Sequence, residues 1–340
     1  MSQHLPRRRR RPIVSAALVA TALVASLAAC SGQASANGTS GSGSDTVTIA
    51  AHSNGVATET TVELKTVDSI RDTLPESVKK SGKLVIGLGA LPFGFPPIAY
   101  IGDDQKTYTG TDPDLARLVA KVLGLQPEFK NATWQNLFIG IDNGTIDTGF
   151  SNVTVTEERK QKYDFASYRQ DILAFAVPKK STWEFDDDYE NLAGLTVATD
   201  RGTNQEKILL EWQQKLQSEG KTLDVKYYPD TNAVFLALNS GKIDAYFSPN
   251  PAVAYQETQA AKTANPIRTA GTYSGAGETV KGLIAATSKK GSGLAEPVAA
   301  AFDYLIENGQ YAAVLKAYNL ENESVTTSEV NPAGLPLSNE

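Results

Sequence analysis

Two segments of this chain, residues 138–151 and 235–248, repeat one pattern. Phenylalanine, glycine, isoleucine, aspartate, phenylalanine and serine recur in register at a constant offset of 97 positions (235 − 138 = 97). Each copy has an apolar stretch at helical spacing, a glycine turn and a short apolar run that ends in polar residues. This pattern predicts a helix followed by a buried strand. Two copies of one such unit indicate two similar α/β lobes rather than one large sheet.

The polar residues that end the two repeats predict where a ligand binds. In open α/β sheets, ligands bind beyond the carboxyl ends of the strands. Ser151 and Asn152 follow the first predicted strand, and Asn250 follows the second. We therefore expect these side chains to face each other across a cleft between the lobes. The length of 340 residues exceeds the usual range of one domain and agrees with two lobes.

The N-terminal 29 residues have the pattern of a secretory signal peptide. Five arginines precede an apolar run, residues 13–29, that is short for a membrane span of about 20 residues. The run closes with Leu-Ala-Ala-Cys, which resembles the bacterial lipobox and predicts lipidation of Cys30. Because Cys30 is the only cysteine, the alternative is a free thiol beside an ordinary cleavage site. We expect a chain that is anchored to the outer face of the cell membrane by lipidated Cys30.

Composition and the alternation of helices and strands divide the rest of the chain. Residues 30–73 are predicted to be the lipid anchor and a flexible tether, because 31–44 consists almost entirely of small polar residues. Within this range, residues 45–66 alternate polar and apolar weakly, so they either add an edge strand or stay loose. Connecting strands near 177–179 and 275–283 are predicted to form a hinge. The remaining boundaries are lobe 1 in 74–178 and 281–320, lobe 2 in 179–280, and a polar tail in 321–340.

Charge and residue types exclude several classes of function. Without residues 1–29 the chain has 27 Lys+Arg (32 − 5) against 38 Asp+Glu, a net charge of −11, which disfavours a nucleic-acid partner. His4 lies in the signal peptide and His52 lies near the tether, so a Ser-His-Asp triad and a His/Cys zinc site are excluded. The sequence predicts no cofactor and no metal. Catalysis by paired carboxylates stays open, although no spacing singles out a pair.

Arg159 is the basic residue that stands out. Residues 153–159 predict a strand end, a capping Thr156 and a helix whose first turn holds Arg159. A cation there opposes the helix dipole, which suggests a compensating anion. A guanidinium group fits a carboxylate through two parallel hydrogen bonds. The residues alone leave open a surface arginine paired with Glu157, which would contribute little.

Several segments resemble the bacterial extracellular solute-binding proteins of family 3, which serve importers driven by ATP hydrolysis, chiefly for polar amino acids. The combination from Ile146-Asp147 through Thr154-x-Thr156-Glu157-x-Arg159 is fairly specific. The resemblance implies an α/β, two-lobed, periplasmic-binding-protein-like (type II) fold, with the ligand cleft between lobes joined by two hinge strands. It extends over nearly all of residues 74–318, through segments 84–87, 110–115, 144–159, 164–165, 202–203 and 241–244.

The resemblance also implies roles for individual residues. Arg159 would grip the α-carboxylate of the ligand, and Thr154 would support the same group through its hydroxyl and backbone. Thr203 and Asn204, at a predicted helix start in lobe 2, would meet the carboxylate from the other side, as anions do at helix N-termini.

The sequence departs from the family pattern at three positions. Pro249 stands where the family usually has the aspartate that pairs with the ligand's α-ammonium group. An aspartate is also replaced near Gly89, and Thr111 replaces an aromatic residue. The loss of two carboxylates weakens the case for a cationic amino acid and leaves neutral or acidic amino acids, or a related carboxylate. Asn250 or Asp230 is a candidate to bind the amine instead.

Three aromatic residues, Phe93, Phe95 and Trp134, are candidates to pack against the apolar part of a ligand. The alternative is that they anchor their loops in the core. The resemblance implies a monomeric binding protein, not an enzyme, that closes on a small molecule and delivers it to an ABC permease and its ATPase. The alternative function is an enzyme on the same scaffold, such as a dehydratase of small carboxylates.

Overall fold

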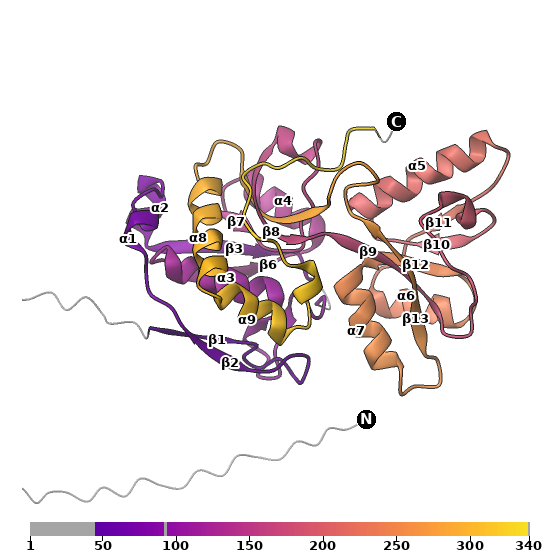
Figure 1. Ribbon diagram of the computed structural model, residues 1–340, viewed down its shortest axis with the longest axis horizontal. Helices are drawn as coiled ribbons and strands as arrows, with labels where there is room; N and C mark the ends of the chain where they lie inside the picture. Colours follow the sequence, from indigo (N-terminus) through magenta and orange to yellow (C-terminus); the bar gives the residue numbers. More distant parts are fainter. Residues whose placement is uncertain (1–44, 92–93, 339–340) are drawn as a thin grey trace, which may run out of the picture. The chain divides into compact units, whose positions relative to one another are not determined.

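Two lobes, each built on a five-stranded sheet, make up the part of the chain that the computed structural model describes, residues 45–91 and 94–338 (Figure 1). These residues belong to one structural unit, Ser44–Glu340. The predicted signal peptide, Cys30 and Phe93 lie outside the described residues. Within the described ranges, no helix has the length and apolar character needed to cross a membrane.

The sheet of lobe 1 forms around β3 (Lys83–Leu88), an apolar run whose residues are mostly buried. β3 is parallel to both of its neighbours, whereas β14 is antiparallel to both of its own. The strand order is β6 (Gln126–Asn131), β3, β7 (Thr148–Gly149), β14 (Leu283–Lys289) and β8 (Tyr163–Gln170). The helices of this lobe are α1 (Asp68–Arg71), α2 (Glu76–Ser81), α3 (Thr111–Val122), α4 (Trp134–Asp142), α8 (Ala295–Glu307) and α9 (Gln310–Ala317).

Helix α3 illustrates how the sequence specifies a lobe 1 element. Leu115, Leu118, Val119 and Val122 recur at helical spacing and are fully buried. The chain leaves the helix at Gly124, whose φ of +63° suits glycine after a helix end.

Lobe 2 has the same arrangement of strands as lobe 1. β10 is parallel to β11 and β12, and β9 is antiparallel to both of its neighbours. The order is β11 (Asp224–Lys226), β10 (Thr196–Ala198), β12 (Ala245–Pro249), β9 (Ile172–Pro178) and β13 (Ile267–Ser274). Its helices are α5 (Asn204–Ser218), α6 (Thr231–Asn239) and α7 (Asn250–Ala260). Both sheets therefore combine parallel and antiparallel neighbours.

The internal repeat corresponds to equivalent helix–strand pairs, α4 with β7 and α6 with β12. The repeated aspartates explain why the pattern recurs. The Asp147 carboxylate accepts a hydrogen bond from the Val85 backbone N–H at 2.8 Å, and Asp244 accepts one from Thr196 N–H, also at 2.8 Å. Each aspartate thus fixes the start of its strand to the neighbouring parallel strand, in both lobes.

The crossing between the lobes differs from the prediction in one place. β8 belongs to lobe 1 and β9 to lobe 2, so the chain crosses at Asp171, not near 177–179. The return crossing, residues 275–282, lies where the sequence placed it. The two crossings bond to each other, because Asp171 N–H donates to Gly282 and Gly275 N–H donates to Asp171, both at 2.9 Å. A Cβ atom at Gly275 would overlap the Asp171 carboxylate, so this close approach requires glycine.

Residues 45–73, assigned to the tether, fold onto lobe 1, and of the two alternatives for residues 45–66 the structure has the strand. β1 (Thr46–Ile49) and β2 (Thr60–Glu63) form an antiparallel pair, and α1 follows. Ile49 and Leu64 are buried in the lobe 1 core. The weak alternation of this segment concealed the few apolar side chains that hold it in place.

The predicted polar tail is also folded. Residues 321–338 begin with a 3-10 turn, Glu321–Glu323, and then run along β8, where Val330 pairs with Ala166. Glu323 and Leu335 are fully buried. A buried glutamate needs a charged partner, and this one lies far away in sequence, so composition could not reveal it.

Candidate functional site

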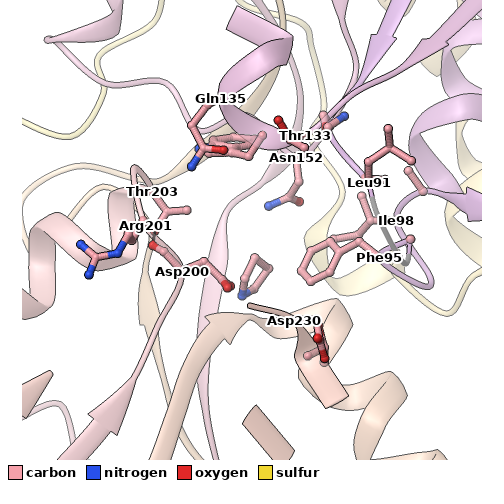
Figure 2. Close-up of a pocket in the computed structure, with 18 of the residues that line it drawn as sticks. Leu91, Phe95, Ile98, Thr133, Gln135, Asn152, Asp200, Arg201, Thr203 and Asp230 are labelled. Carbon is pink, nitrogen blue, oxygen red and sulfur yellow. Dashed lines mark hydrogen bonds between the residues drawn. The ribbon is translucent and has the colours of Figure 1, made fainter. Parts of the chain in front are cut away.

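A cleft of about 570 Å³ lies between the two lobes. Its walls come from the carboxyl ends of strands β3, β6 and β7 in lobe 1 and of β10 and β11 in lobe 2, as the strand-end rule predicts. Figure 2 shows Phe95, Ile98 and Leu91 on one side and Asp200, Arg201 and Thr203 on the other. The residues that line the cleft include Phe95, Trp134, Ser151, Asn152, Asp200, Arg201, Thr203, Asn204, Tyr227, Asp230 and Pro249.

Three helices begin at the cleft. The side chains of Thr133, Thr203 and Asp230 accept hydrogen bonds from the first turns of α4, α5 and α6, at 3.4, 3.2 and 2.9 Å. Threonine and aspartate are favoured at the N-cap, because their side-chain oxygens accept hydrogen bonds from N–H groups of the first turn. Because the positive ends of the helix dipoles meet here, the cleft favours polar and anionic groups.

Ser151 and Asn152 line the cleft from lobe 1, as predicted. The hydroxyl of Ser151 accepts a hydrogen bond from Gly89 N–H at 2.8 Å. The backbone N–H of Asn152 donates to Asp112 at 2.6 Å, and its side-chain oxygen accepts from Arg169. Asn152 has a φ of +51°, a conformation that asparagine tolerates better than most residues. The strand end is therefore held rigidly at the cleft.

Two of the three predicted aromatic residues line the cleft, and the third, Phe93, lies outside the described residues. Phe95 also packs against the lobe 1 core, as the alternative role required, and its contact with a ligand stays a prediction. Trp134 begins α4, and its indole N–H donates to the Gly202 carbonyl at 3.0 Å. Since Gly202 belongs to lobe 2, Trp134 forms a contact between the lobes as well as a wall of the cleft.

Arg159 is placed differently from the prediction. It starts a three-residue 3-10 helix, Arg159–Gln161, rather than the first turn of an α-helix, so the dipole argument has little force. Its guanidinium donates to the Thr154 carbonyl at 2.9 Å and to the Gly202 carbonyl at 3.2 Å. It lines a second hollow, of about 660 Å³, beside α5, rather than the main cleft.

No carboxylate of the described residues forms an ion pair with Arg159. Burial lowers its pKa to about 10, although Asp171 and Glu158 oppose this change. The guanidinium is therefore still charged at neutral pH. Its centre lies 5.4 Å from the rings of Trp134 and Phe138, so aromatic faces and backbone carbonyls hold it in place.

Thr154 and Asn204 meet at the hinge. The Thr154 hydroxyl donates to Asp171 Oδ2 at 2.7 Å, and the Asn204 amide donates to the same oxygen at 3.0 Å. Asn204 also donates to the Gly275 carbonyl at 2.9 Å. Burial raises the pKa of Asp171 to about 6, while the bond from Thr154 and the charge of Arg169 oppose the rise. These two predicted ligand residues thus join both lobes to the crossing point, and of the two only Asn204 also lines the cleft.

Asn250 is also bonded elsewhere. Its amide donates to Glu323 Oε1 at 2.9 Å, and the other oxygen of Glu323 accepts from Arg169. Of these residues, Arg169 and Glu323 are fully buried. Burial alone would lower the pKa of Arg169, but the charges of Glu323 and Asp112 outweigh it and raise the pKa. The residue proposed as an amine ligand is therefore part of a buried network, because its partner lies in the supposed tail.

The sequence missed Asp200 and Arg201, which follow β10 and line the cleft. Asp200 Oδ2 accepts a hydrogen bond from the Tyr246 hydroxyl at 2.8 Å, and burial raises its pKa. The Arg201 guanidinium lies 3.7 Å from the centre of the Tyr227 ring. The strand-end rule would have found both residues had it been applied to β10 as well as to the repeats. Across residues 45–91 and 94–338, no group of His, Cys, Asp and Glu is arranged to hold a metal ion.

Comparison with known proteins places the geometry in context. Residues 90–321 match the family described as bacterial extracellular solute-binding proteins, family 3. The L-cystine-binding protein TcyJ of Escherichia coli K12 is 33% identical over 172 residues, which are 51% of this chain and 60% of that protein. The arginine-binding protein ArgT of Corynebacterium glutamicum is 27% identical and aligns with 78% of this chain and 83% of its own length.

Solved structures agree on the fold. The substrate-binding protein AbpA of Streptococcus pneumoniae, bound to L-arginine, superposes with a TM-score of 0.60 at 23% identity and covers 72% of this chain and 98% of its own. An ancestral arginine-binding protein bound to glutamine superposes with a TM-score of 0.57 at 27% identity, over 71% of this chain and 99% of its own. The two-lobed α/β fold that the sequence predicted is confirmed.

Proposed function

Because the chain belongs to the bacterial extracellular solute-binding proteins of family 3, we propose that it is the amino-acid-binding component of an ABC importer. The observation that carries the proposal is the cleft of about 570 Å³ between the lobes, with aromatic and charged side chains on its walls. A cleft of this size holds a small organic ligand. In this proposal the lobes close on the ligand, and the closed protein docks on a permease that works with a cytoplasmic ATPase.

The carboxylate of the ligand is assigned to Arg159 and to the start of α5. Arg159 bonds only to backbone carbonyls, and its partner Gly202 immediately precedes the α5 cap, Thr203. A ligand carboxylate would replace the neutral Gly202 carbonyl as acceptor, and a charge-assisted bond is the stronger of the two. The first-turn N–H groups of α5 add favourable electrostatics.

The ammonium group of the ligand is assigned to Asp200. This carboxylate lines the cleft and bonds to Tyr246 through one oxygen, which leaves the other oxygen to accept from a ligand. Asp230 lines the same cleft but already bonds to the first turn of α6. We therefore assign to Asp200 the pairing with the α-ammonium group, which the proline at position 249 cannot provide.

This assignment selects between the ligand classes that the sequence left open. A second carboxylate on an acidic amino acid would meet Asp200 and Asp230 at short range, and like charges repel strongly in a cleft of low dielectric. A cationic amino acid carries two positively charged groups and needs a free carboxylate for each. Of Asp200 and Asp230, Asp230 already caps helix α6. We therefore assign a neutral amino acid as the ligand.

Asp200→Asn is expected to weaken binding of the neutral amino acid that the wild type prefers by about tenfold or more, because a bond to a charged group contributes about 1.5–3 kcal/mol. The measurement is calorimetric titration of wild type and variant. Asp230→Asn is the matched control, since asparagine also caps helices, and it should change the affinity much less. If Asp230→Asn weakened binding as much as Asp200→Asn, a ligand with two ammonium groups would be indicated instead.

We propose binding rather than catalysis. The relatives named above are binding proteins, and an ancestral amino-acid-binding protein described as a precursor of cyclohexadienyl dehydratase shares the fold. The alternative, a dehydratase of small carboxylates, would need a catalytic acid in the cleft. Incubation of the purified protein with such carboxylates separates the cases, because a binding protein returns them unchanged.

Cys30 is proposed to carry the lipid that anchors the protein outside the cell membrane, as a monomer. Cys30→Ser should move the protein from the membrane fraction to the soluble extracytoplasmic fraction without changing its affinity for amino acids. Cell fractionation with immunoblotting checks this result. A Cys30→Ser protein that stayed with the membrane would contradict lipid anchoring.

A further inference from the structure

The C-terminal strap, residues 321–338, is the part of the described chain that the binding function does not explain. The family match ends at residue 321, so the strap lies almost entirely beyond it. In Figure 1 the C-terminal segment, drawn in yellow, runs from α9 past β8 and ends on the side of α5. It therefore passes from lobe 1 to lobe 2 without belonging to either crossing strand.

The strap is attached to lobe 1 by backbone bonds. Ser167 N–H donates to the Glu329 carbonyl, and Asn331 N–H donates to Phe165, both at 3.0 Å. Further along, Leu335 exchanges two bonds with residues 155 and 157, at 3.0 and 2.9 Å. The Lys160 ammonium donates to the Pro332 carbonyl at 3.0 Å. Lobe 1 thus holds the strap along most of its length.

A different set of contacts attaches the strap to lobe 2. The Leu335 side chain is fully buried and belongs to the hydrophobic cluster of lobe 2, together with Ile208 and Trp212. The Lys207 ammonium, on α5, donates to the carbonyls of Pro336 and Leu337. Leu335 therefore bonds to lobe 1 through its backbone and packs on lobe 2 through its side chain.

Glu323 makes a second connection near the start of the strap. One of its oxygens accepts from Arg169 of lobe 1, and the other accepts from Asn250 of lobe 2. Arg169 in turn donates to Asn152, which lines the cleft. The strap thus contacts both lobes at both of its ends.

We propose that the C-terminal strap is a third link between the lobes, which holds them together around the cleft in addition to the two crossing strands. The crossing strands bond to each other through Asp171, Gly275 and Gly282. If α5 moves away from lobe 1 while lobe 1 holds the strap, two contacts must break. These are the bonds from Lys207 to the strap and the packing of the Leu335 side chain on lobe 2. These contacts therefore favour the arrangement in which the lobes touch, and this inference does not depend on which ligand binds.

The test measures lobe separation in the ligand-free protein. Fluorophores placed through Ile139→Cys and Leu236→Cys, in a Cys30→Ser background, report the distance between α4 and α6; both positions are exposed, at 56% and 72%. Lys207→Gln is expected to raise the population of separated lobes about three- to tenfold, because the shorter, uncharged glutamine side chain cannot keep both bonds to the strap. Leu335→Ala should act in the same direction, and the two changes should not be additive, because they break one attachment.

Lys160→Gln is the matched control. It also removes one lysine bonded to a strap carbonyl, that of Pro332, but Lys160 belongs to lobe 1, where backbone bonds also hold the strap. Its distance distribution should equal that of the wild type. The proposal is overturned if Lys207→Gln leaves the distribution unchanged, or if Lys160→Gln shifts it equally. Should Leu335→Ala fail to fold, as judged by its melting curve, the Lys207→Gln result decides.

Discussion

Arg159→Ala is expected to raise the dissociation constant for the preferred amino acid by tens- to hundredfold, while the protein stays folded. The reason is the loss of charge-assisted bonds to the ligand carboxylate, each of which contributes about 1.5–3 kcal/mol. The guanidinium bonds only to the carbonyls of Thr154 and Gly202, so its removal breaks no ion pair. Calorimetric titration measures the affinity, and thermal unfolding checks the fold.

Arg201→Ala is the control for this experiment, because Arg159 lines the hollow beside α5, whereas Arg201 carries the same charge but lines the main cleft. Its guanidinium lies against the Tyr227 ring, at the edge of lobe 2, so the variant should retain most of the affinity. If Arg201→Ala lost the affinity and Arg159→Ala kept it, the carboxylate would be bound on the other lobe, and our assignment of Arg159 would be wrong.

Glu323→Ala is expected to lower the free energy of unfolding by about 3–5 kcal/mol, because it leaves Arg169 buried without its carboxylate partner. Both side chains are almost inaccessible to solvent, with exposed fractions of 1% and 0%. Asn250 would lose its acceptor at the same time. Denaturant unfolding, monitored by circular dichroism, measures the difference.

The double variant Arg169→Met/Glu323→Leu tests the origin of this effect. An apolar pair of similar volume removes both charges at once, and such replacements are often close to neutral. The double variant should therefore be markedly more stable than Glu323→Ala. A loss below about 1 kcal/mol for Glu323→Ala would contradict a buried ion pair, since exposed pairs contribute that little.

Local patterns in the sequence predicted the frame of the molecule. The repeat of 14 residues specified a helix–strand pair in each lobe, and the recurrent Asp147 and Asp244 fix those strands to their neighbours in the same way. The rule that ligands bind at strand ends located Ser151 and Asn152 at the cleft. These features depend on periodicity and on contacts that both lobes repeat, and the sequence displays both.

Contacts between distant segments were beyond the reach of the sequence. Thr154 and Asn204 have the residue types expected of a ligand site, but both bond to Asp171, which neither neighbours in the chain. Asn250 bonds to Glu323, 73 positions away. A polar residue near a cleft can serve the ligand or the scaffold, and only the three-dimensional partners distinguish the two.

The strap escaped prediction for a related reason. Its composition is polar. The side chain of Leu335 packs in the lobe 2 hydrophobic cluster, but this leucine forms no periodic pattern with its neighbours. The segment is ordered by its partners in β8 and α5 rather than by its own propensity. Residues 45–73 are held in the same way, by Ile49 and Leu64.

Calorimetric titration of residues 30–340 with each of the twenty amino acids tests most directly whether the cleft between the lobes binds an amino acid. We expect one molecule of a neutral amino acid to bind per chain with a micromolar or lower dissociation constant, which corresponds to about −8 kcal/mol or better. Glutamate, lysine and arginine should bind at least about tenfold more weakly, a difference of about 1.4 kcal/mol. Absence of binding heat for every amino acid, or tightest binding by glutamate or aspartate, would contradict the account.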